Sequence, residues 1–244
     1  MNARFLALEL RRAVRNGRYL IFTVAVPALM FVLFVNLYGG QAGTFPNGVP
    51  VVTSLMMNMA LFGVIAGPLS TGAGIAVERG TGWQRQLQLT PLSSTGYVLT
   101  KGVLGMVVAL PAILLVSLVG VVVEGVRLEP LQWVAVLGTL WLAALPFVLV
   151  GIVVGLFATP DGMQAVTGVA SMLFGLLGGI WIPADVAPDW LRTIMQVLPV
   201  YWAKELALAS VASGVDVGRA VLVVGAWVLG LGLLAARRFR AAHV

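Results

Sequence analysis

The sequence predicts an all-α polytopic membrane protein, and three observations support this prediction. First, 60% of the 244 residues are hydrophobic and only 10% are Asp, Glu, Lys or Arg, whereas an ordinary soluble domain has about 25% charged residues. So few charges cannot cover the surface of a soluble fold of this size. Second, the mean hydropathy is +1.01, and 19–77 contain no charged residue. Third, the apolar runs are continuous and lack the alternation of apolar and polar residues that barrel strands show. Because a lipid bilayer offers the backbone no hydrogen-bond partners, such runs are expected to cross it as helices.

We predict six membrane-spanning helices, because a crossing needs about 20 predominantly apolar residues. The spans are expected at 19–37, 51–77, 102–123, 133–158, 163–182 and 218–236. The first two are separated by GGQAGTFPNGVP, which is rich in the turn-forming residues Gly, Pro and Asn. We expect one domain, 1–244, that consists of an N-terminal helix (1–18), spans one to five (19–182), an external segment (183–216), span six (217–236) and a tail (237–244).

The distribution of Lys and Arg predicts which ends of the spans face the cytoplasm. Segments 1–18, 78–101, 159–162 and 237–244 together hold 11 Lys and Arg residues, whereas the opposite loops hold four. This difference predicts a multi-pass protein whose two termini and segment 78–101 face the cytoplasm. Membrane topology thereby explains the net charge of +6, and nucleic acid is not expected as a partner.

The N-terminal segment, 2–17, is predicted to be an amphipathic helix in front of the first span. It combines Phe5 and other apolar side chains with arginines that include Arg11, Arg12 and Arg15. A helix of this kind can lie in the headgroup plane of the bilayer. The sequence leaves open a simpler interpretation, in which the arginines only anchor the first span on its cytoplasmic side.

The longest external segment, 183–216, is too apolar for a solvated loop. We predict two short helices in it, at 189–198 and 203–212, with a break at Pro199. Neither is long enough to cross a bilayer. Trp190, Tyr201 and Trp202 are residue types that favour the membrane interface. The segment is therefore predicted to be a re-entrant or interfacial helical hairpin over the external mouth, and a plain structured loop is the alternative.

The chain lacks residues that most catalytic and energy-coupling sites need. It has no Cys, and its one His is His243, next to the C-terminus, so that we expect no metal site. It has no G-x-x-x-x-G-K-[ST] phosphate loop. The interiors of the predicted spans hold no Asp, Glu, Lys or Arg, which argues against a proton- or sodium-driven carrier. We therefore do not expect an enzyme, and the energy for active transport has to come from a partner.

The stretch ERGTGWQRQLQLTPL, 78–92, follows the uncharged residues and forms most of the longest cytoplasmic loop. A helix here places Trp83, Leu87 and Thr90 near one face, and it ends before Pro91, because the residue that precedes a proline disfavours the helical conformation. Such a short helix is suited either to a groove on another protein or to the lipid headgroups. The residues alone leave both possibilities open.

Taken together, these features resemble the permease subunit of a type-2 ABC exporter of the daunorubicin-resistance-like group. The matching features are an Arg-rich helix before a first span that contains Pro27, the stretch at 78–92, GGIWIPADVAPDWLRTIMQVLPVYWAKELA after the fifth span, and a last span that ends in RRFR. The resemblance covers essentially the whole chain. It implies two permease copies, as a homodimer or a heterodimer with a related permease, each bound to a separate ATP-binding-cassette ATPase. ATP and Mg²⁺ then belong to that ATPase, and this chain carries no cofactor.

The resemblance also implies roles for individual residues. The helix between spans two and three is the coupling helix, and the N-terminal elbow helix touches the ATPase as well. The substrate path lies between the two copies, mainly along spans two and five, with the external helices as a gate. The implied coupling residues are Glu78, Arg79, Thr81, Trp83, Arg85, Leu87 and Thr90, and the elbow residues are Phe5, Arg11, Arg12 and Arg15. The implied path residues are Asn58, Met59, Phe62, Met172, Phe174 and Leu176, and the gate residues are Trp181, Pro183, Trp190, Tyr201 and Trp202.

Two features of the spans leave alternatives open. Asn58 is a strongly polar side chain within the second predicted span, and in lipid it needs a hydrogen-bond partner, which can be another helix or a substrate. Small-x-x-x-small patterns at 63–67 and 151–155 indicate close helix packing, either within the chain or between two copies.

The resemblance thus implies the transmembrane subunit of an ATP-driven exporter of amphipathic drugs, antibiotics or lipids. An exporter of lipid-linked polysaccharide has the same topology and is an alternative within the class. A channel or scaffold protein without an ATPase is the alternative from another class.

Overall fold

The computed structural model describes residues 3–17, 21–38, 43–45, 48–83, 86, 94–182, 184 and 187–241. Regular structure within these residues is helical, apart from one antiparallel bridge between Thr44 and Pro50. The elements, in chain order, are α1 (Ala3–Arg15), the π-helical turn η1 (Ile21–Ala25), α3 (Val26–Tyr38), α4 (Val51–Gly80), α6 (Ser94–Val122), α7 (Pro130–Leu142), α8 (Ala144–Gly155), α9 (Pro160–Leu177), α10 (Asp189–Val197), α11 (Pro199–Leu208) and α12 (Val217–Ala241). The predicted all-α class is confirmed.

Four stretches of helix among the described residues are long and apolar enough to cross a membrane. They are Val51–Gly80, Gly96–Val122, Pro130–Gly155 and Val217–Arg237, and they correspond to predicted spans two, three, four and six. Thr23–Tyr38 is a shorter apolar helix. Helix α9 has 18 residues, which makes it about 27 Å long, and Asp161 lies in its first turn. The multi-pass character is therefore confirmed, whereas the count of six spans stays a prediction.

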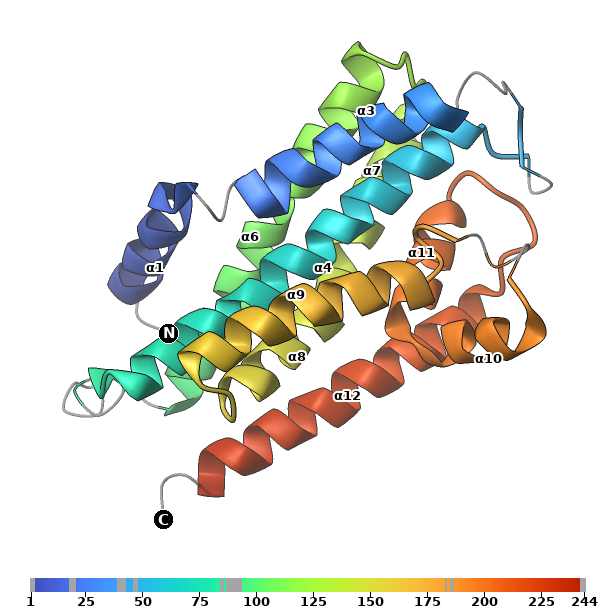
Figure 1. Cartoon of the computed structure of the whole chain (residues 1–244). Coiled ribbons are helices and arrows are strands. Elements are labelled where there is room, and N and C mark those ends of the chain that lie inside the picture. Colours follow the sequence, from blue (N-terminus) through green and yellow to red (C-terminus); the bar gives the residue numbers. More distant parts are fainter. Residues whose placement is uncertain are drawn as a thin grey trace.

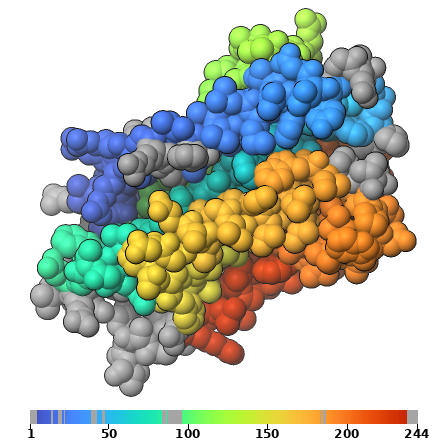
Figure 2. Space-filling view, viewed as in Figure 1, coloured from blue at the N-terminus to red at the C-terminus, as the bar shows by residue number. Residues whose placement is uncertain are grey.

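Helix α4 is the centre of the bundle. Helices α3, α6, α8 and α9 all pack against it. The axes of α3, α4 and α9 are nearly parallel, and the chain runs along α4 in the opposite direction to α3 and α9 (Figure 1). The space-filling view in Figure 2 shows α4 recessed between α3 and α9. Fully buried side chains of α4, among them Met56, Met59 and Ile65, form much of the hydrophobic core. Much of this predicted span is therefore covered by its own chain rather than by lipid.

The two ends of the bundle carry different elements (Figure 1). One end, called the α1 end below, holds α1, the last turn of α4, the first turns of α6 and the last turns of α12. The opposite end, called the α10–α11 end, holds α10, α11 and the start of α12. Because α1 and the end of α12 lie at the same end, the arrangement is compatible with termini on one side of a membrane.

Prolines divide two of the predicted spans. Pro27 has no N–H to donate to the Thr23 carbonyl, and the preceding residues form the π-helical turn η1 instead of a regular α-helix. Pro146 likewise has no N–H for the Leu142 carbonyl, and the helix is interrupted at Ala143 between α7 and α8. Both interruptions follow from a proline within an apolar run.

Several helix ends differ from the predicted bounds. Helix α4 continues to Gly80 instead of ending at position 77. Helix α6 begins at Ser94, whereas the prediction starts the span at position 102, because it assigns the charged Lys101 to a loop. Helix α11 begins at Pro199 rather than at position 203, because proline fits the first turn of a helix, where an N–H has no partner to lose.

Helices α4 and α8 cross in close contact through glycines. A Cβ atom on Gly72 would meet the backbone of Gly151, and a Cβ atom on Gly151 would lie 2.8 Å from the Pro68 carbonyl oxygen. A Cβ atom on Gly155 would in turn meet the backbone of Gly72. The small-x-x-x-small pattern at 151–155 therefore serves packing within the chain.

Candidate functional site

Two buried carboxylates and a buried lysine meet at the α1 end. Lys101 of α6 is 1% exposed. Its Nζ atom donates to Glu9 Oε2 of α1 and to Glu78 Oε1 of α4, in both cases at 2.6 Å. The side chains of Glu9 and Glu78 are themselves only 8% and 6% exposed. One ammonium group thus joins three helices that are far apart in the sequence.

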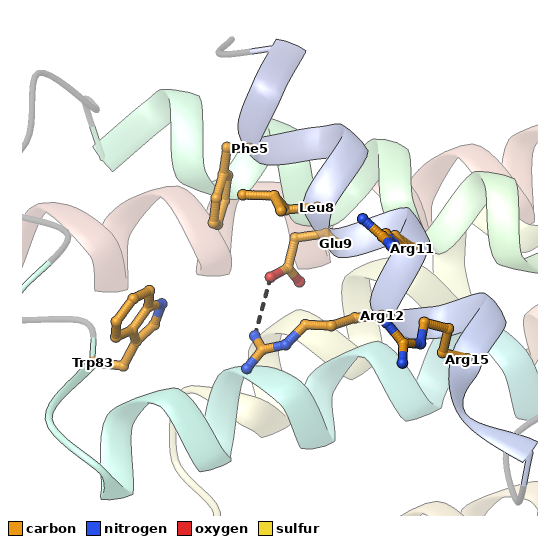
Figure 3. A pocket seen from close by; sticks show the side chains of 7 residues that line it. All are labelled: Phe5, Leu8, Glu9, Arg11, Arg12, Arg15 and Trp83. Atoms are coloured by element: carbon orange, nitrogen blue, oxygen red, sulfur yellow. Dashed lines mark hydrogen bonds and ion pairs between the residues drawn. The ribbon is translucent and has the colours of Figure 1, made fainter.

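Aromatic and guanidinium groups surround these charges. The Tyr97 hydroxyl donates to Glu78 Oε2 at 2.6 Å, and the Phe5 ring stacks on Tyr97 with centroids 6.3 Å apart. Arg12 Nη1 donates to Glu9 Oε1 at 3.4 Å, as Figure 3 shows, and lies 4.0 Å from Glu78 Oε1. We call these residues the α1 cluster: Phe5, Glu9, Arg12, Glu78, Tyr97 and Lys101.

The α1 cluster is electrically balanced. Its two carboxylates face the ammonium group of Lys101 and the guanidinium group of Arg12, and each carboxylate accepts hydrogen bonds from two donors. A buried ion costs several kcal/mol unless it is paired and hydrogen-bonded. The cluster therefore stabilises the packing of α1 on α4 and α6 only while all its charged members are present, because loss of one leaves a buried charge without its partner. Among the described residues, no group of three or more His, Asp or Glu side chains could hold a metal.

The predicted coupling residues differ in how far they are available to a partner. Glu78 belongs to the α1 cluster, so its carboxylate is already paired within the chain. Arg79 Nη1 donates to the Gly155 carbonyl at 3.1 Å, and the Thr81 hydroxyl bonds back to its own helix. Trp83 is 43% exposed and thus offers apolar surface to a partner. Outside the described residues lie Arg85, Leu87 and Thr90.

The predicted elbow residues divide between the inside and the outside of the protein. Phe5 packs in the α1 cluster, whereas Arg11, Arg12 and Arg15 are exposed. Of these three, Arg12 is the one that pairs with carboxylates of the cluster. The elbow helix is therefore attached to the bundle through Phe5 and Arg12, whereas the Arg11 and Arg15 side chains are exposed.

Predicted path residues on α4 contact the segment that follows α9. Asn58 Nδ2 donates to the Ile180 carbonyl at 3.2 Å, and the Phe62 ring packs against Trp181 with centroids 5.4 Å apart. Both contacts tie α4 to the turn after α9. The hydrogen-bond partner that Asn58 needs in lipid is thus present within the chain.

The remaining path residues range from buried to exposed. Met59 is fully buried in the core, so it contributes packing rather than a surface. Phe174 and Leu176 are half-buried, and Met172 is 61% exposed. Helix α9 therefore offers a more open apolar surface than α4 at these positions.

Replacement of Asn58 by leucine separates its two possible roles. We expect a loss of about 0.6 kcal/mol in the free energy of unfolding, the average for an interhelical hydrogen bond in a membrane, measured by denaturation in detergent. Ser54→Ala is the matched control, because Ser54 lies on the same helix and its buried hydroxyl has no hydrogen-bond partner among the described residues. A transport defect far larger than this loss of stability would assign Asn58 to substrate contact instead.

The predicted gate residues lie around the α10–α11 end, with Pro183 outside the described residues. Trp190 of α10 is exposed. Tyr201 and Trp202 of α11 pack edge to face at 5.1 Å, and the Trp202 indole donates to the Gln196 carbonyl of α10 at 2.7 Å. Helix α11 also packs on α4, α7 and α12. The segment predicted to be external is therefore a packed pair of helices rather than a solvated loop.

The sequence does not predict Glu9, Tyr97 and Lys101 as site residues. A signal for two of them is present, because Glu9 is the only acidic residue before Glu78 and Lys101 is one of two lysines in the chain. Glu9 is an isolated acidic residue among arginines, and Lys101 is a lysine beside an apolar run. If either side chain is buried, it needs a partner of opposite charge. The sequence alone cannot tell that the partners are each other.

Comparisons with known proteins agree with the helical membrane architecture. The model of a family described as "ABC-2 type transporter" matches residues 5–211. The chain is also 27% identical over 224 residues to a Bacillus subtilis (strain 168) protein named "Putative transport permease YvfS", and the alignment covers 91% of this chain and 89% of that protein. The residues that the family model matches include every residue of the α1 cluster.

Proposed function

Because the chain belongs to the ABC-2 type transporter family and is a multi-pass membrane transport permease, we propose that it is the transmembrane subunit of an ATP-driven exporter of the daunorubicin-resistance-like group. The family implies an ATPase partner in general. In the proposal this ATPase is a separate subunit that binds at the α1 end. The cargo is an amphipathic drug, antibiotic or lipid, which leaves the cytoplasm or the inner leaflet by alternating access.

The α1 cluster is the observation that supports coupling at this end. It joins α1, the last turn of α4 and α6 through Lys101, so a force applied just after α4 acts on three helices together. Helix α4 is continuous over 30 residues and therefore about 45 Å long. A tilt that starts at Glu78 is carried along α4 to Asn58 and its hydrogen bond to Ile180.

We further propose that two permease copies, identical or related, enclose the substrate path between them. The exposed apolar side chains of α9, such as Met172, support a path along this helix. Trp181 and Trp190 would then lie near its external end. The buried Met59 is excluded from direct contact in this arrangement.

The proposed location is a bacterial inner membrane with the α1 end in the cytoplasm. The excess of Lys and Arg in the segments at this end supports the orientation. The orientation also places the docking site where ATP is present.

Purification of the chain from its native membrane tests the proposal. We expect an ATP-binding-cassette ATPase to co-purify, and we expect amphipathic drugs or lipids to stimulate its ATP hydrolysis. If no ATPase co-purifies, the exporter assignment fails, and a channel or scaffold becomes the better description. Stimulation by lipid-linked polysaccharide alone would contradict the proposed cargo but not the class.

A Trp83→Ala substitution is expected to uncouple transport from ATP hydrolysis. Trp83 is a half-exposed tryptophan next to the α1 cluster, and a tryptophan anchor at an interface contributes about 2 kcal/mol or more. Transport by reconstituted permease and ATPase should therefore fall roughly tenfold or more, whereas basal ATP hydrolysis should persist. The measurement is cargo transport per ATP hydrolysed in proteoliposomes.

Leu131→Ala is the matched control for this substitution. Leu131 is a highly exposed apolar residue at the start of α7, far along the chain from the proposed docking site. Its removal should leave the ratio of transport to hydrolysis unchanged. An equal ratio in the Trp83 variant and the control would refute the coupling role of Trp83.

A further inference from the structure

An open groove of about 500 Å³ lies beside α1 (Figure 3). Phe5, Leu8 and Trp83 supply apolar walls, and Arg11, Arg12 and Arg15 supply guanidinium groups. In Figure 3 the Trp83 ring faces the groove from the segment after α4, whereas the other side chains come from α1. The groove thus combines an apolar surface with three arginines.

The charges in the groove are not balanced. Glu9 is the only acidic residue in its lining, and Glu9 is already paired with Lys101 and Arg12. Arg11 and Arg15 form no ion pair with any residue that the structure describes. They lie one helical turn apart and hence on the same side of α1. The groove therefore presents two uncompensated positive charges next to apolar side chains.

We infer that this groove binds the headgroup of an anionic phospholipid. Planar guanidinium groups pair with phosphate oxygens through two parallel hydrogen bonds, and Arg11 and Arg15 are free to do so. Leu8 is 62% exposed, and together with Trp83 it suits the glycerol and upper acyl part of the lipid, because tryptophan favours the level of the headgroups. Basic pockets beside membrane helices are common sites for acidic headgroups.

Lipid explains the lining of the groove better than an acidic protein segment does. A docking surface for acidic side chains needs the arginines but not the exposed Leu8. The groove also belongs to an amphipathic helix directly before the first apolar helix, and such a helix lies at the boundary between headgroups and acyl chains. A bound lipid would contact α1 and Trp83 together and so stabilise their relative position.

Fluorescence quenching by brominated lipids tests this inference on the full chain in nanodiscs, without any ATPase. The signal of Trp83 is isolated as the difference between the protein and its Trp83→Phe variant. We expect brominated phosphatidylglycerol to quench this signal more strongly than brominated phosphatidylcholine at equal mole fraction. Because each basic residue near the surface contributes about a fivefold factor in affinity, Arg11→Gln with Arg15→Gln should lower the relative association constant roughly 25-fold.

A control variant and three contrary results complete the quenching experiment. Arg127→Gln removes an exposed charge from the loop after α6 and should leave the quenching of Trp83 unchanged. Inorganic phosphate should not displace the lipid. Equal quenching by both lipids, an unchanged preference in the double arginine variant, or loss of quenching on addition of inorganic phosphate would each overturn the inference. Because no ATPase is present, failure here leaves the proposed transport function untouched.

Discussion

A Lys101→Met variant is expected to lose about 3–5 kcal/mol of folding stability, the cost of breaking a buried ion pair by removal of one partner. Lys101 is almost fully buried and donates to two carboxylates at 2.6 Å. Without it, Glu9 and Glu78 are left buried with only Arg12 as a cationic partner. The measurement is the free energy of unfolding in detergent, followed by tryptophan fluorescence.

The other lysine of the chain provides the matched control. Lys204 is also buried, but its Nζ atom lies 3.6 Å from Glu205 Oε1. The Glu205 side chain is 23% exposed, so water can solvate this carboxylate. Lys204→Met should therefore cost less than Lys101→Met. Equal losses in the two variants would show that the α1 cluster has no special role in stability.

A variant without the three buried charges of the cluster provides the rescue. Glu9→Gln and Glu78→Gln added to Lys101→Met leave no unpaired buried ion, and replacement of a complete buried set is often neutral. We expect this triple variant to recover more than half of the lost stability. If it recovers none, the loss in Lys101→Met comes from packing rather than from charge.

A Gly72→Leu variant is expected to lose at least about 3 kcal/mol, the upper end for an overpacked site. The first added atom would already meet the backbone of Gly151. A side chain in that position can rotate away from an obstacle, but a backbone cannot, so α4 and α8 must move apart. The expected result is a lower yield of folded protein in the membrane and a lower midpoint of thermal unfolding.

Gly74→Leu is the control for this clash. Gly74 lies two residues after Gly72 on the same helix and is exposed. Apart from its two chain neighbours and the backbone of its own helix, no atom lies within 4 Å of the position of a Cβ atom. A leucine there adds apolar surface without a collision, so its stability should lie within about 0.5 kcal/mol of the parent, as for most surface substitutions. Similar losses of stability in the two variants would mean that helix flexibility, and not the close crossing of α4 and α8, is the reason for a glycine at position 72.

The two halves of the proposed coupling site were not equally predictable. Trp83 stands out in the sequence because a large apolar side chain follows the charged residues Glu78 and Arg79. Lys101 is hidden in the sequence because a charge at the edge of an apolar run looks like the end of a span. Its buried charge is compensated by carboxylates from two other helices, and local patterns carry no information about such partners.

The external segment illustrates the same division. The sequence predicts two short helices around Pro199, and the structure contains α10 and α11 in this segment. It does not predict that Trp202 is buried and bonded to the Gln196 carbonyl, since tryptophan in an apolar external segment is equally compatible with a membrane interface. Burial of this ring accompanies the packing of α11 against α4, α7 and α12.

By itself, the sequence determined that this protein is helical and multi-pass, because long uncharged apolar runs leave a membrane chain few other structures. The tertiary structure alone decided which residues at 78–83, after the second predicted span, are buried. Glu78 turns inward and shares the Lys101 ammonium group with Glu9, whereas Trp83 stays exposed. The physical reason is that the pairing of Glu9 with Lys101 spans 92 positions of the chain and arises only when α1, α4 and α6 pack together.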